Sequence, residues 1–165
     1  MGAHTADATL AAVNVRRARR TELGPVFAMI RRARGGQLSE ADIVEKATGY
    51  GYLSAELNER MIGIVAILVE NSIACARDLH AVSTSMRGLA TVALMDAVEA
   101  EAGALACEAV IIQVPTGSTL IEALLRDRHY APRSLAELRK AWREVAATQF
   151  EADVPLWVRN LRELL

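Results

Sequence analysis

Three apolar segments separated by two short polar turns constrain the fold of this chain more than any other feature. The segments cover residues 52–57, 61–69 and 73–82, and the second of them is rich in β-branched side chains. Residues 58–60 and 70–72 separate the segments, and each turn contains an asparagine, which favours hairpin turns. Because β-branched residues favour strands, the pattern predicts an antiparallel meander of three strands.

A small polar loop follows the third segment of this meander. Ser83, Thr84 and Ser85 interrupt the apolar run, and Arg87 opens an amphipathic helix that we expect to end at Gly103. The start of a helix offers several unpaired backbone N–H groups together with the positive end of the helix dipole. The junction therefore predicts an anion site suited to phosphate, with Arg87 as an added cation, although many junctions of this kind bind no ligand.

The remaining segments alternate between strands and helices. In chain order, we expect a mobile tail over residues 1–12, a strand over 13–18, a helix from Thr21 to about Arg34, a short helix from Ser39 to Gly49, a strand over 109–114 and a helix over 118–128. No repeat, linker or low-complexity segment interrupts the sequence, so a single domain is predicted over residues 13–165. The order of the elements predicts an α+β (mixed α/β) fold with helices on both faces of a sheet.

The carboxy-terminal residues 131–165 are predicted to form a helical extension. Residues 134–137 have the pattern of a capping box, and the apolar stripe that follows them extends to about Thr148. Pro155 is typical of the first turn of a helix, and we expect a last helix there that carries Trp157 on its apolar side. The large apolar side chains of this region either pack on the sheet or form an interface with a second copy or another protein.

The composition limits the classes of partner and compartment. The 165 residues carry a net charge of −1, so no global field favours nucleic acid or an anionic membrane. No apolar run approaches the roughly 18 residues that a membrane span needs, and the start of the chain lacks the pattern of a secretory signal. We therefore expect a cytoplasmic protein, and the excess of arginine over lysine hints at a bacterial genome. Cys75 and Cys107 lie in apolar segments without a CxxC pattern, so they are interpreted as core thiols rather than metal ligands.

With these elements placed, residues 13–130 resemble the GNAT (GCN5-related N-acetyltransferase) superfamily. The hairpin that is followed by Gly63 resembles the second and third strands of that family. Residues 82–88 are similar to the exit of its fourth strand, and residues 119–130 resemble its second cofactor segment, which usually ends in a Gly-Phe pair. The resemblance implies a central mixed, mostly antiparallel sheet that is flanked by helices.

The resemblance also implies a function. The chain would be an acyl-CoA-dependent N-acyltransferase that moves an acetyl or similar group from acetyl-CoA, or another acyl-CoA, to a small-molecule or peptide amine. The amine would attack the thioester directly, the fourth strand would hold the pantetheine through its backbone, and the loop after it would hold the pyrophosphate. The cofactor-binding residues implied in this way are Ala81, Val82, Arg87, Gly88, Leu89, Ala90, Thr91, Val92 and Ser118.

Several matched positions depart from the pattern of the family, among them Ser118 at the place of a usual asparagine and His129-Tyr130 at the place of the Gly-Phe pair. The family signature R/Q-x-x-G-x-G/A has Ala90 at its first glycine and Val92 at its last small residue. A β-branched side chain at Val92 stands where a small residue lets the pyrophosphate approach closely. Leu125 occupies the position at which the family often has a tyrosine as general acid. The sequence therefore leaves an alternative open: a non-catalytic GNAT-fold module that acts as an acyl-CoA sensor or a protein-interaction subunit.

Asp78 and His80 are the candidate catalytic bases. They alternate along the third segment of the meander, where a carboxylate or an imidazole could take a proton from an ammonium substrate. The other interpretation is a polar pair at a sheet edge. His129 is interpreted as a surface turn residue, Tyr130 as a core residue and Glu99 as a solvated charge.

Overall fold

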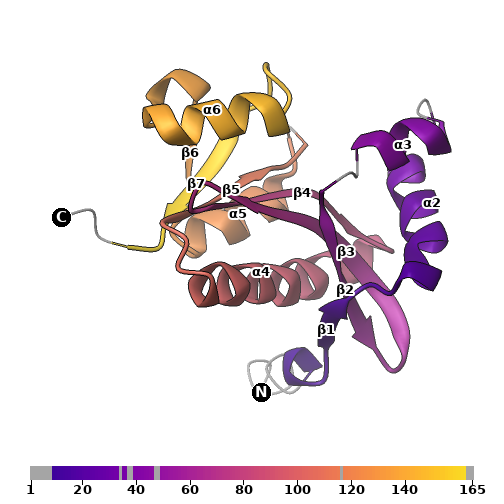
Figure 1. Ribbon diagram of the computed structural model, residues 1–165. Coiled ribbons are helices and arrows are strands. Elements are labelled where there is room, and N and C mark those ends of the chain that lie inside the picture. Colours follow the sequence, from indigo (N-terminus) through magenta and orange to yellow (C-terminus); the bar gives the residue numbers. More distant parts are fainter. Residues whose placement is uncertain (1–8, 34, 37–38, 47–48, 116, 163–165) are drawn as a thin grey trace. The chain divides into compact units, whose positions relative to one another are not determined.

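The structure, a computed structural model, describes residues 9–33, 35, 36, 39–46, 49–115 and 117–162 (Figure 1). Its strands form one hydrogen-bonded sheet in the order β1-β2-β3-β4-β5-β7-β6. The strands are β1 Asn14–Arg17, β2 Gly51–Leu57, β3 Arg60–Glu70, β4 Ile73–Ala81, β5 Ala109–Gln113, β6 Ala131–Arg133 and β7 Leu156–Asn160. The pairing of β4 with β5 is parallel, whereas β1 with β2, β5 with β7 and β6 with β7 are antiparallel. The predicted α+β class with a mixed, mostly antiparallel sheet is confirmed.

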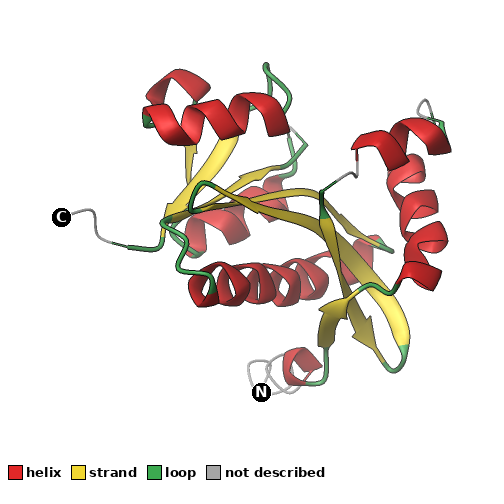
Figure 2. Cartoon of the chain, in the orientation of Figure 1, coloured by secondary structure: helices red, strands yellow, loops and turns green. Residues whose placement is uncertain are grey.

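Helices connect these strands (Figure 2). The α-helices are α2 Leu23–Ala33, α3 Glu40–Lys46, α4 Arg87–Ala104, α5 Thr119–Asp127 and α6 Lys140–Gln149, and the short 3-10 helices are η1 Arg20–Glu22, η2 Thr84–Met86 and η3 Leu135–Glu137. Within the described ranges, none of the helices has both the length and the apolar character that a membrane crossing requires.

The chain divides into two compact units. The first unit contains the described residues up to 66 and residues 79–95, and the second contains residues 67–78 and the described residues from 96 onward. The units are described separately below. The single domain predicted over residues 13–165 stays a prediction.

The predicted meander is confirmed, with tighter turns than expected. Asn58 and Glu59 form the first turn with φ of 51° and 63°, and Asn71 and Ser72 form the second with φ of 48° and 64°. Positive φ at both central residues is the signature of a type I′ turn, whose twist matches that of the flanking strands. Each hairpin therefore has two turn residues instead of the predicted three.

In the first unit, α2 packs on the meander. Val26 and Ile30 are buried against Tyr52 and Ile64, and the ring of Phe27 meets that of Tyr52 edge to face at 5.8 Å between centroids. Such an arrangement of two aromatic rings is favourable.

The predicted helix starts in the first unit have mixed outcomes. Thr21 does not cap α2, because it lies inside η1. The predicted cap at Ser39 is confirmed, since its Oγ accepts from the Asp42 N–H at 3.1 Å while its own N–H donates to the Asp42 carboxylate at 3.1 Å. Of the predicted mobile tail, residues 1–8 lie outside the described residues, whereas 9–11 are helical.

In the second unit, α6 covers one face of the strands. Trp142 and Val145 pack on Cys75, Ile111 and Val158 in one buried cluster. Cys75 and Cys107 are both buried free thiols, as predicted.

The carboxy-terminal region corrects the prediction of a helical extension. One of its elements is the helix α6, but Pro155 starts no helix, because Leu156–Asn160 is the strand β7. β7 pairs with β5 on one side and with β6 on the other, so its backbone groups are satisfied by segments far away in the sequence. The capping box at residues 134–137 is formed, but it closes the single 3-10 turn η3. The predicted apolar position Leu164 lies outside the described residues.

Candidate functional site

A break in the regularity of β4 lies near its carboxyl end. Asp78 has φ of 55°, in the left-handed region, whereas a regular strand has strongly negative φ. A residue of this conformation inside a strand marks a β-bulge, which re-aims the side chains that follow. The predicted alternation of Asp78 with His80 assumed an unbroken strand, and the bulge removes that assumption. The Asp78 carboxylate lies 3.6 Å from the Arg77 Nε, and both side chains are largely buried.

His80 follows the bulge as a half-buried side chain. Burial lowers the pKa of its imidazole below the ordinary 6.5, and the positive charges of Arg87 and Arg32 lower it further. His80 is therefore neutral at pH 7, which is the form that can accept a proton.

The end of β4 is hydrogen-bonded to β3 on one side. The N–H of Val82 donates to the carbonyl oxygen of Ile62 at 2.9 Å. Because successive peptide groups of a strand point in opposite directions, the N–H of Ala81 points away from β3. The Ala81 N–H is therefore directed to the side of β4 that lies opposite β3.

The loop after β4 uses part of its own backbone. The N–H of Met86 donates to the carbonyl oxygen of Ser83 at 3.2 Å, and that of Arg87 donates to Thr84. The prediction that the loop presents several unpaired N–H groups is therefore wrong for these two. The Arg87 guanidinium differs from them: it is exposed, and it has no hydrogen bond or ion pair with any residue that the structure describes.

Helix α4 sits unusually close to β3. A Cβ atom added at Gly63 would lie 2.8 Å from the Ala90 Cβ, 3.0 Å from the His80 carbonyl oxygen and 3.2 Å from the Leu94 Cδ1. Separations this short are not tolerated in packed interiors, so only glycine fits at this point of β3. The sequence matched Gly63 to a family pattern, but its physical reason is this contact with α4.

The predicted cofactor-binding residues differ in their exposure. Val82 and Arg87 are exposed, whereas Ala90 and Thr91 are buried, so the side chains of the latter two cannot face a ligand. The half-buried members of the set are Ala81, Gly88, Leu89, Val92 and Ser118. All except Ser118 belong to one continuous segment of the first unit, and Ser118 lies at the start of α5 in the second unit.

The second unit contains no proton donor at the position where the family often has its tyrosine. Leu125 is fully buried there. The nearby Tyr130 is also buried, and its hydroxyl donates to the Glu99 carboxylate at 3.1 Å. Burial raises the pKa of Tyr130 well above its usual range, and the charge of Glu99 raises it further. Tyr130 therefore stays protonated, in agreement with the prediction of a core role.

Glu99 is not the solvated charge that the sequence indicated. Its side chain is 13% exposed and forms ion pairs with Arg128 and with Arg159, the latter at 3.0 Å. These partners come from the end of α5 and from β7, so no local pattern announces them. Through Glu99, these contacts connect α4 with the end of α5 and with β7.

His129 ends α5 in the left-handed conformation, with φ of 68°. Its N–H donates to the Arg126 carbonyl oxygen at 3.0 Å, and the Tyr130 N–H donates to that of Leu125 at 2.9 Å. These two bonds form a Schellman motif, in which glycine is the usual residue at this position. The interpretation of the exposed His129 as a turn residue is confirmed.

Comparisons with known proteins connect this geometry to a known fold. No family model matches the sequence, and no curated protein matches it significantly. A GNAT-family acetyltransferase from Staphylococcus aureus superposes with a TM-score of 0.69 at 12% identity, over 92% of this chain and 100% of that one. N-acetylglutamate synthase from Neisseria gonorrhoeae, in complex with coenzyme A and N-acetylglutamate, gives a TM-score of 0.67 at 16% identity, over 92% of this chain and 35% of that one. The PaiA N-acetyltransferase from Thermoplasma acidophilum, in complex with coenzyme A, gives 0.62 at 8% identity, over 90% and 98%. The chain therefore has the fold of the GNAT acetyltransferases.

Proposed function

We propose that this protein is an acyl-CoA-dependent N-acyltransferase that moves an acetyl or similar group to an amine. The fold supports acyl transfer in general, and two of the proteins with the same fold are described as complexes with coenzyme A. The observation that carries the proposal is the exposed guanidinium of Arg87 at the first residue of α4, which pairs with none of the residues that the structure describes. A cation there reinforces the positive end of the helix dipole, and a phosphate group is the ligand that such a combination favours.

The residues of the junction fit a bound coenzyme A. The N–H of Ala81 is directed away from β3, as a backbone contact to an amide of pantetheine requires. Ala90 replaces the first glycine of the family signature, but its methyl group lies in the space that Gly63 leaves on β3 rather than in the loop. This change therefore leaves the loop open. At the last small-residue position of the matched signature, Val92 remains as a larger side chain, and we expect it to weaken binding rather than prevent it.

The base is the part of the chemistry for which this chain offers a clear candidate. When bound, acetyl-CoA supplies the thioester carbonyl and the thiolate leaving group. His80, neutral at pH 7, takes the proton that the amine loses as its nitrogen forms the new bond. Asp78 is the second candidate, and its carboxylate lies 3.6 Å from the Arg77 Nε. The Leu125 side chain has no ionisable proton, and the buried Tyr130 hydroxyl donates to Glu99, so the departing thiolate would take its proton from solvent.

Thermal unfolding with and without acetyl-CoA tests the proposal. A ligand at 100 times its Kd stabilises the native state by about 2.7 kcal/mol. For a chain of this size the midpoint rises by roughly 5–10 °C. Arg87→Ala should remove most of this rise, whereas Lys140→Ala, which deletes an exposed cation of α6, should keep it.

Turnover is measured separately, as thiol release from acetyl-CoA in the presence of a panel of small amines and peptides. Thiol release that depends on the amine supports the enzyme. Binding without release would instead support an acyl-CoA sensor, and no thermal shift at millimolar acetyl-CoA would contradict the proposal at its first step.

A further inference from the structure

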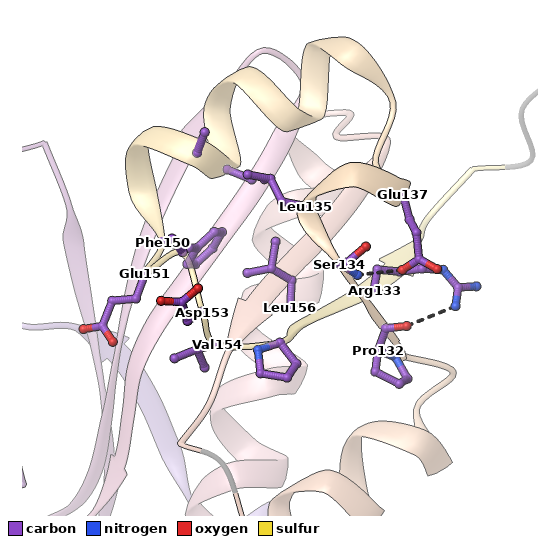
Figure 3. Close-up of a pocket in the computed structure, with 14 residues that line it drawn as sticks. Pro132, Arg133, Ser134, Leu135, Glu137, Phe150, Glu151, Asp153, Val154 and Leu156 are labelled. Atoms are coloured by element: carbon purple, nitrogen blue, oxygen red, sulfur yellow. Dashed lines mark hydrogen bonds between the residues drawn. The ribbon is translucent and has the colours of Figure 1, made fainter.

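The second unit contains a cavity of about 530 Å³ that the proposed reaction does not use (Figure 3). Its walls come from β6, η3, the carboxyl end of α6 and residues 150–155, which lead into β7. Sites for small organic ligands typically have volumes of about 300–1,000 Å³. The cavity therefore has the size of a small-molecule site.

One wall of the cavity is fixed by a side chain from outside it. The side-chain Nε2 of Gln113 donates to the backbone carbonyl oxygens of Glu151 at 2.9 Å and Val154 at 3.1 Å. Its side-chain Oε1 accepts from the Glu151 backbone N–H at 3.0 Å. Three hydrogen bonds from the end of β5 thus hold the segment between α6 and β7. A wall held in this way is pre-organised, so a ligand does not have to order it on binding.

The floor of the cavity is apolar. Leu156 and Ala146 are buried beneath it, and Leu135 and Phe150 are partly buried side chains that pack on the core cluster around α6. Figure 3 shows Leu156 in the middle, with Phe150 to one side of it and Leu135 above. A floor of this kind favours the hydrocarbon part of a ligand.

The charges of the lining are unevenly distributed. At one end, the Glu137 carboxylate accepts from the Ser134 N–H at 2.6 Å and lies beside the guanidinium of Arg133, so its charge is compensated (Figure 3). Figure 3 shows Glu151 directed away from the other lining side chains. At the end near Phe150, Asp153 is exposed and has no hydrogen bond or ion pair with a described residue. Among the described residues, the uncompensated charge of the lining is therefore negative, and it lies on the same segment, residues 150–155, that carries the aromatic ring of Phe150.

We propose that this cavity binds a small organic ammonium ion with an apolar body. The ammonium group lies at the end formed by Asp153 and Phe150, where it gains an ion pair and a cation–π contact. The apolar body lies over Leu156 and toward Leu135. The proposal is independent of the proposed acyl transfer, because it concerns a different set of residues and is tested without coenzyme A.

The test compares three probes of similar shape that differ in charge: 2-phenylethylammonium, 2-phenylethanol and phenylacetate. Each is titrated into the full chain at pH 7, and amide chemical shifts give the Kd and the residues affected. We expect the ammonium ion to bind with a millimolar Kd or better and to shift residues 132–135 and 146–156. The neutral alcohol should bind about tenfold more weakly, and the anion should bind still more weakly.

Two variants identify the groups responsible. Asp153→Asn should reduce the affinity for the ammonium ion to that for the alcohol, and Phe150→Leu should reduce it severalfold while the apolar packing is kept. Asp127→Asn changes an exposed carboxylate of α5 outside the cavity and should leave the affinity unchanged. Equal binding of all three probes, shifts confined to other residues, or no binding in the millimolar range would each overturn the proposal.

Discussion

At the scale of single residues, the left-handed backbone conformation of Ala106 lowers the stability of the folded protein. Ala106 has φ of 58°, and it lies just beyond α4. Its N–H donates to the Gly103 carbonyl oxygen at 3.1 Å, and the Cys107 N–H donates to that of Ala102 at 2.9 Å. This is a second Schellman motif without its usual glycine. Gly103, which was predicted to end the helix, lies one position inside it instead.

The substitution Ala106→Gly should therefore stabilise the protein. A residue with a Cβ in the left-handed conformation costs about 1–2 kcal/mol, and glycine removes that cost. The greater conformational freedom of glycine in the unfolded chain offsets part of this stabilisation. We expect a net stabilisation of about 0.5–1 kcal/mol in urea unfolding. Ala100→Gly, at an exposed position inside the helix, is the matched control and should destabilise by a similar amount. If both substitutions destabilise the protein, Ala106 is not strained.

At the scale of elements, the close packing of α4 on β3 depends on the absence of a side chain at Gly63. Gly63 and Ala90 meet where a second Cβ has no room, and His80 offers its carbonyl oxygen to the same space. The start of α4, and with it Arg87, is therefore positioned by the packing of a helix on a strand. A change at Gly63, which is not among the residues proposed to bind a ligand, therefore reaches the proposed site through packing.

Gly63→Ala should destabilise the protein by about 1–3 kcal/mol, because overpacking forces the helix or the strand to shift. Adding Ala90→Gly removes the closest contact and should recover part of that loss. The measurement is a double-mutant cycle in urea, together with the thermal shift by acetyl-CoA. Gly24→Ala, at a helical glycine with open space around it, is the control and should not destabilise. Strict additivity of Gly63→Ala and Ala90→Gly would show that the two residues are not in contact.

At the scale of the whole molecule, the features that the sequence predicts correctly are those that depend on residues close together in the chain. The meander and the junction before α4 were recognised because turn residues and apolar runs encode them locally. β7 was missed because a proline followed by apolar residues is compatible with a helix, and only pairing with β5 and β6 decides for a strand. The bulge at Asp78 and the ion pairs of Glu99 were missed for a similar reason, since no local pattern specifies them.

The reaction of the whole protein should depend on pH through His80. Its pKa lies below the ordinary 6.5, so kcat/KM for acetyl transfer should rise with pH to a plateau, and the midpoint of the rise should lie below that ordinary value, with an acceptor that does not titrate in this range. His80→Gln should remove this limb and lower kcat by about 10²–10⁴-fold. His129→Gln, at an exposed turn, should change neither. An unaltered profile in His80→Gln would transfer the role of base to Asp78.

The same group links stability to pH. Since the folded protein prefers the neutral imidazole, the contribution of His80 to the free energy of unfolding is fully present above the unfolded pKa of 6.5. It is lost as the pH falls below that value toward the lower pKa of the folded state.

The place of β7 in the sheet has a consequence for the newborn chain. β5 is made well before β7, yet β7 is its partner on one side, and η3 and α6 must be synthesised in between. At cellular rates of synthesis, that delay is on the order of seconds. During that time, β5 has an exposed edge with unpaired peptide groups, and a strand of another nascent chain can pair with this edge. Yield in the cell therefore depends on how quickly β7 arrives and closes that edge.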